Sequence, residues 1–177
     1  MGLFMRIEYL GLVISFFCFL MGIKFPDWDF KWKLRHRSII THSPLFSTIL
    51  VFLYYTKLEE RLFSYVIASF SFGIAIHMIF DLFPHGWGSG ALLKIPIFKM
   101  TCSPKNSQYF FLFTIILNFF YVLLFLERKE EYFVYILFGF LYMLSRIPYE
   151  KKFWRPFGLY FLLIALGALN FVDIALK

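Results

Sequence analysis

The chain has 177 residues, of which 60% are hydrophobic and only 16% are charged, whereas an ordinary soluble domain is about 45–50% apolar and about 25% charged. This composition excludes a soluble globular protein. The net charge is +7, which in a membrane protein points to orientation and to anionic lipid headgroups, so membrane lipids are the expected partners. We expect no nucleic-acid partner, because the basic residues are spread over several loops. The oligomeric state is left open.

Six apolar stretches predict six transmembrane helices. A bilayer span needs about 20 mostly apolar residues, and hydropathy predicts spans over residues 8–24, 41–56, 62–83, 109–127, 132–147 and 157–175. A Gly- and Pro-rich run begins the long connection between the third and fourth spans and ends the helix there. Its apolar segment 91–98 is expected either to lie along the membrane interface or to dip back into the membrane. The predicted fold is an all-α, polytopic transmembrane helix bundle that forms a single integral membrane domain over residues 1–177.

Basic residues are unevenly divided between the two ends of the predicted bundle. Twelve Lys and Arg residues lie in the loops after the first, third and fifth spans, and six lie on the other side. The positive-inside rule therefore places these three loops in the cytoplasm and both termini outside. The expected location is a bacterial-type inner membrane, with the polar loops facing the cytoplasm.

Histidines and aspartates gather in or beside the loops after the first and third spans. At the end of the third span, His77 and Asp81 have i, i+4 spacing, which puts both side chains on one helix face about 5–6 Å apart at Cβ. Imidazole and carboxylate groups are ligands of Zn, Mn, Fe or Ni. His85 extends the set from the loop or is an ordinary loop residue. The sequence thus predicts a site for one or two divalent ions, with zinc the first candidate, and its expected ligands are Asp27, Asp29, His36, His42, His77 and Asp81.

The same residues also have structural interpretations. His77 and Asp81 form an interhelical hydrogen-bonded pair in one alternative, because such pairs are common in membrane bundles. Asp27 and Asp29 are then solvated turn acids, and His36 is a residue of the membrane interface. These alternatives remain open on the sequence alone.

Hydroxyl and guanidinium side chains near the second span have two interpretations each. Thr41 and Ser43 are more simply explained as helix caps, with Pro44 near the first turn, than as catalytic groups. Arg35 and Arg37 are either orientation anchors or phosphate ligands.

The order of these motifs is similar to that of a known family. Pro26-Asp27-x-Asp29, the run His36-Arg37-Ser-x-x-Thr-His-Ser-Pro and the later His77-x-x-x-Asp81 resemble the YdjM-like family of predicted inner-membrane metal-dependent hydrolases. The resemblance covers about residues 26–98 and implies that the matched residues belong to a metal-dependent site. Phe30 stands where the family commonly has a histidine.

The residues and the resemblance together predict a membrane-embedded metal-dependent hydrolase. Its expected substrate is a phosphoester of a lipid or lipid-like molecule at the cytoplasmic face, with Asp29 as the general base and Arg37 holding the phosphate. The alternative is a non-enzymatic membrane protein with a structural metal site, which acts by assembly or membrane perturbation. Ion or proton transport is the third hypothesis, because carboxylates and imidazoles also form proton relays.

Overall fold

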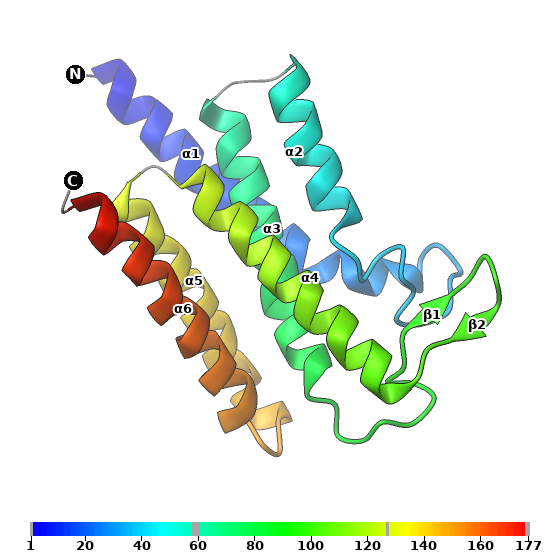
Figure 1. Cartoon of the computed structure of the whole chain (residues 1–177). Coiled ribbons are helices and arrows are strands. Elements are labelled where there is room, and N and C mark those ends of the chain that lie inside the picture. The colour runs from blue at the N-terminus through cyan, green and yellow to red at the C-terminus, as the bar shows by residue number, and fades with distance from the viewer. Residues whose placement is uncertain (1, 58–60, 127, 176–177) are drawn as a thin grey trace.

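The computed structural model describes residues 2–57, 61–126 and 128–175. Each of the six predicted stretches forms a helix (Figure 1). A 3-10 turn follows α1 and another follows α5, and the loop between α3 and α4 forms a small antiparallel hairpin. The elements in chain order are α1 (Gly2–Lys24), η1 (Pro26–Asp29), α2 (Leu45–Lys57), α3 (Arg61–Leu82), β1 (Lys94–Ile95), β2 (Met100–Thr101), α4 (Pro104–Phe125), α5 (Lys129–Arg146), η2 (Ile147–Tyr149) and α6 (Trp154–Ala175).

Within the described residues, three helical segments are long and apolar enough to cross a membrane: α3, α4, and Lys129–Tyr149, which comprises α5 and η2. The apolar parts of the other three helices are shorter, at Tyr9–Lys24, Leu45–Thr56 and Trp154–Leu169. By length and composition, the structure therefore supports a helical membrane protein, and three of the six predicted spans meet the requirements for crossing a membrane; the other three stay a prediction.

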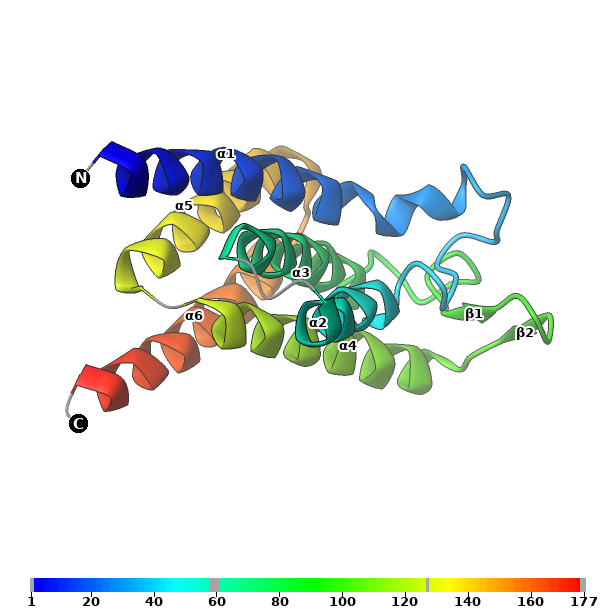
Figure 2. The same ribbon diagram turned by 90° about the horizontal axis from the view of Figure 1, so that it is seen from above.

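Helix α3 lies at the centre of the bundle, between α1 on one side and α4 on the other (Figure 2). Its buried residues occur on all sides of the helix, from Ser64 to Ile79. A helix that is apolar all round is one that other elements surround. Because α3 is central, several other elements can contact its C-terminal end. This end carries His77 and Asp81.

Helices α1 and α3 approach closely where Gly22 faces Gly73. A Cβ atom added to Gly73 would lie 2.7 Å from the backbone nitrogen of Ile23, and one added to Gly22 would lie 3.0 Å from the carbonyl carbon of Phe70. Small residues let helix backbones pack this closely in membrane bundles. The crossing also brings the end of α1 against the last turns of α3.

The two loops that carry the predicted site residues lie at the same end of the bundle (Figure 1) and are hydrogen-bonded to each other. The Ile39 N–H donates to the carbonyl of Lys94 at 2.8 Å, and the Lys94 N–H donates to the carbonyl of Arg37 at 2.9 Å. The segment 91–98 thus enters the hairpin that braces the first loop. Its residues Ala91 and Leu93 are buried.

The glycine crossing gives a prediction about stability. Replacing Gly73 with alanine should lower the free energy of unfolding by about 1–3 kcal/mol, because the added methyl group overlaps the backbone of α1. The matched control is Gly158→Ala in α6, where an added Cβ meets nothing within 4 Å. Thermal unfolding of the detergent-solubilised variants tests this, and equal melting temperatures for the two variants would contradict it.

Candidate metal centre

The turn η1, which begins at Pro26 just after α1, places its two aspartates in different surroundings. The Asp29 side chain points inward and is completely buried, whereas the Asp27 carboxylate is about half exposed. Asp29 Oδ2 accepts the backbone N–H of Arg37 at 2.6 Å and lies 3.3 Å from His36 Nδ1. A buried carboxylate needs such partners, so Asp29 holds the first loop in a folded conformation.

Residues 38–44 form a turn rather than the first turn of a helix. The predicted second span begins at residue 41, but α2 begins at Leu45. The N–H groups of Thr41 and His42 both donate to the carbonyl of Ser38, at 3.2 and 2.9 Å. Ser43 Oγ accepts the N–H of Leu45 at 3.3 Å, which is a capping contact at the start of α2. This turn directs the buried His42 ring toward α3.

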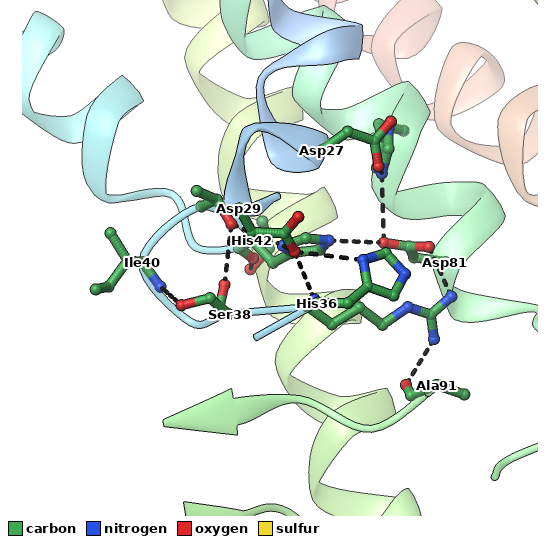
Figure 3. A network of polar contacts seen from close by, with 12 residues as sticks. Asp27, Asp29, His36, Ser38, Ile40, His42, Asp81 and Ala91 are labelled. Carbon is green, nitrogen blue, oxygen red and sulfur yellow. Dashed lines mark hydrogen bonds and ion pairs between the residues drawn. The ribbon is translucent and has the colours of Figure 1, made fainter. Parts of the chain in front are cut away.

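Three predicted ligands, His42, His77 and Asp81, lie close together. Figure 3 shows His42 and Asp81 facing each other. His42 Nε2 lies 3.2 Å from Asp81 Oδ2, and His77 Nε2 lies 3.4 Å from the same oxygen. A tetrahedral ion with bonds of about 2.0–2.1 Å separates its ligand atoms by about 3.3 Å. Both distances are close to this spacing, and the three ligand atoms lie within 4.8 Å of one another, so His42, His77 and Asp81 could hold a metal ion.

Two of the converging atoms are buried without hydrogen bonds. Within the described part of the chain, His42 Nε2 and Asp81 Oδ2 have no hydrogen-bond partner of suitable geometry. Leaving buried polar atoms unpaired costs about 1–3 kcal/mol each. A bound cation between them would remove this cost, so the residues present fit a metal ion.

The hydrogen bonds behind the histidines favour the tautomers that a metal requires. His77 Nδ1 lies 2.8 Å from the carbonyl of Ile23, so this nitrogen carries the proton and Nε2 presents its lone pair. Thr41 Oγ1 donates to the Ser38 carbonyl at 3.3 Å and therefore accepts from His42 Nδ1 at 3.0 Å. Metal-binding histidines commonly donate their second N–H to an oxygen in this way.

Burial lowers the pKa of the His42 imidazole from its ordinary value of 6.5, although the nearby Asp81 carboxylate acts in the opposite direction. His42 lies in the loop before α2, where it is completely shielded from solvent. A lowered pKa keeps the ring neutral at pH 7, which is the form that binds a metal ion.

Arg37 fixes the orientation of the Asp81 carboxylate. Its Nη2 donates to Asp81 Oδ1 at 2.7 Å and its Nη1 donates to the carbonyl of Ala91 at 2.6 Å. The backbone at Arg37 has φ 61°, a left-handed conformation that costs a residue other than glycine about 1–2 kcal/mol. The contacts of this side chain and backbone compensate for that cost. Both terminal nitrogens of Arg37 therefore already have partners within the protein. The predicted role of Arg37 in holding a phosphate stays a prediction.

The remaining predicted ligands lie around this group. Asp27 Oδ1 is 3.9 Å from His77 Nε2, so a shift of about half an ångström would bring it to the ligand spacing of about 3.3 Å. His36 and Asp29 form a neighbouring pair whose closest atoms are 3.3 Å apart. His85 lines the adjoining pocket but is not a member of the converging group.

A pocket of about 290 Å³ opens beside the metal-binding group. Its lining includes the predicted ligands Asp27, His36, His77 and Asp81, and α5 contributes Tyr142 and Arg146. Arg146 Nε is buried and has no hydrogen-bond partner among the described residues, and the guanidinium lies over the rings of Phe80 and Tyr149 at 5.8 and 5.4 Å. In the sequence, Arg146 is only one of the twelve basic residues that predict the orientation in the membrane, because no local pattern relates it to the distant histidines.

Comparison of the chain with known protein families, with curated proteins and with solved structures gives no match. The resemblance to the YdjM-like family therefore rests on the motif residues alone.

The geometry predicts how individual residues contribute to metal affinity. His42→Ala should lower the affinity for Zn²⁺ at least about 100-fold because a ligand is lost, and Arg37→Lys about 10-fold because lysine cannot bridge Asp81 and Ala91. His85→Ala is the control and should bind like the wild type. Competition titration with a chromogenic chelator measures the three affinities, and an unchanged affinity in His42→Ala would refute the site.

Proposed function

We propose that the chain is a membrane-embedded, metal-dependent hydrolase that cleaves a phosphoester of a lipid or lipid-like molecule. In this proposal all six apolar helices cross a bacterial-type inner membrane, with the long loop between α3 and α4 at the cytoplasmic face. The observation that carries it is the convergence of His42 Nε2, His77 Nε2 and Asp81 Oδ2 beside an open pocket. Catalytic zinc sites have three protein ligands and one open position.

Zinc suits this ligand set because two imidazoles and one carboxylate bind it in known hydrolytic sites. A divalent ion held by these residues would act as a Lewis acid toward a phosphoryl oxygen and would activate a water molecule for attack. A second ion would use Asp29 and His36, which lie next to the first group with His36 Nδ1 3.3 Å from Asp29 Oδ2.

The residues around the pocket support a division of roles. Arg146 has a buried nitrogen without a partner in the described structure and lines the pocket, so we assign it to bind the phosphoryl oxygens. Asp27 lines the pocket and Asp29 does not, so we assign Asp27 to accept the proton of the attacking water. Arg37 acts as a positioning residue through Asp81.

The reaction then balances as an ordinary hydrolysis. The oxygen of water forms a bond to phosphorus while the phosphorus–oxygen bond to the leaving group breaks. Asp27 takes one proton from the water, and the departing oxygen receives one from solvent. The products are an alcohol and a phosphate.

A structural metal site is the second candidate function. It is favoured by the buried Asp29 and by Arg37, which together tie the first loop to α3. In that case, the metal stabilises the fold and the protein acts by assembly or membrane perturbation. Metal binding energy would then be folding energy.

The two candidates predict different behaviour of Asp81→Asn. For a hydrolase, this substitution should lower turnover at least about 100-fold while the helices stay folded, because one ligand contributes little to the packing of the bundle. For a structural site, the melting temperature should fall in step with metal loss. Metal content, thermal melting and phosphate release from phospholipids and lipid-linked phosphates distinguish the two.

The matched control for this experiment is Glu130→Gln, which also converts a carboxylate to an amide. Glu130 is exposed in the first turn of α5, and the pocket residue Arg146 is at the opposite end of that helix. Wild-type protein that releases no phosphate with any of these lipids in the presence of metal would overturn the hydrolase proposal.

A further inference from the structure

Three pockets meet around Phe83 and Pro84, directly after α3. Both residues line the pocket of about 290 Å³ at the metal-binding group, a second pocket of about 120 Å³ and a third of about 380 Å³. His85 and Glu150 line the first and second pockets, and Arg155 lines the second and third. The shared residues place the second pocket between the other two. We call the second pocket the middle pocket, the third the outer pocket and the first the metal pocket.

The middle pocket has a positive lining. Lys151, Lys152 and Arg155 contribute three cations, and Glu150 contributes one carboxylate. These residues come from the turn after η2 and from the start of α6. A phosphate in this pocket would be within reach of several cationic side chains, which bind phosphate oxygens through charge-assisted hydrogen bonds.

The outer pocket is mostly apolar. It lies between the end of α3, the start of α4 and the start of α6, and its lining includes Leu82, Trp87, Tyr109 and Leu112. Trp and Tyr are typical of the membrane–water interface. An acyl or prenyl chain can enter such a pocket from the bilayer, while Arg155 at its edge favours an anionic group where the chain ends.

From this order we infer that the substrate is a lipid diphosphate. This inference rests on the proposed hydrolase function. The hydrocarbon chain occupies the outer pocket, the phosphate next to the chain binds Lys151, Lys152 and Arg155, and the terminal phosphate lies beside the metal-binding group and Arg146. A lipid with one phosphate would leave either the middle pocket or the metal pocket without its anion.

Hydrolysis in this arrangement releases the terminal phosphate. The oxygen of water bonds to the terminal phosphorus, and the bond between that phosphorus and the bridging oxygen breaks. Asp27 accepts a proton from the water, and the bridging oxygen stays with the lipid. The products are inorganic phosphate and a lipid monophosphate.

The test compares two double variants that remove the same charge from the same end of the bundle. Lys151→Gln with Lys152→Gln empties the middle pocket of two cations. Lys99→Gln with Lys105→Gln is the matched control, because both lysines are exposed and neither lines one of the three pockets. Each zinc-loaded protein is assayed with farnesyl diphosphate and farnesyl monophosphate. Binding of a farnesyl methylenebisphosphonate, which water does not cleave, is measured separately by calorimetry.

We expect the wild type to prefer the diphosphate in kcat/KM. Loss of Lys151 and Lys152 should raise KM for the diphosphate, and weaken binding of the bisphosphonate, about tenfold, with little change for the monophosphate, because two charged contacts to one phosphate are removed. The control variant should resemble the wild type in all three measurements.

The possible outcomes distinguish the lipid diphosphate inference from the hydrolase function on which it rests. Phosphate release that is equal for the two substrates, or equally affected in both double variants, would overturn the lipid diphosphate inference and leave the hydrolase function standing. Selective loss of bisphosphonate binding without turnover of any phosphoester would overturn the hydrolase function and keep the anion pocket. Absence of both binding and turnover in the wild type would overturn both.

Discussion

The candidate site depends on the different partners of the two oxygens of the Asp81 carboxylate. Oδ1 accepts the Arg37 guanidinium at 2.7 Å, which leaves Oδ2 facing the two histidines. Because Arg37 also donates to Ala91, one side chain holds α3, the first loop and the second loop in a single arrangement. An aspartate without this partner would be free to rotate, and the spacing of the three ligand atoms would be lost.

The close packing of α1 against α3 also determines part of the geometry of the site. Gly22 and Gly73 allow the two backbones to approach, and the Ile23 carbonyl beside them accepts the hydrogen bond of His77 Nδ1 at 2.8 Å. The tautomer of His77 therefore depends on a contact between two helices and not on its own sequence neighbours. A substitution at either glycine should disturb the metal-binding group as well as the stability of the bundle.

The bundle also contains a charged pair of a different kind. Arg61 on α3 and Glu131 on α5 form an ion pair, and the Tyr65 hydroxyl donates to the same Glu131 oxygen at 3.1 Å. Opposite charges there compensate each other and join two helices. At the metal-binding group, in contrast, two imidazole nitrogens lie 3.2 and 3.4 Å from one carboxylate oxygen. Imidazole and carboxylate groups are metal ligands, whereas a guanidinium is not, so we assign metal binding to this group only.

The sequence by itself determined the six helices and the residue types of the site. Apolar runs separated by polar loops specify helices through local composition, and the i, i+4 spacing of His77 and Asp81 places them on one helix face. The tertiary structure decided the rest, because those contacts join distant parts of the chain. It places His42 in a turn before α2, engages Arg37 with Asp81, and brings Arg146 into the pocket. No local pattern encodes these contacts, since they arise only when the helices pack around α3.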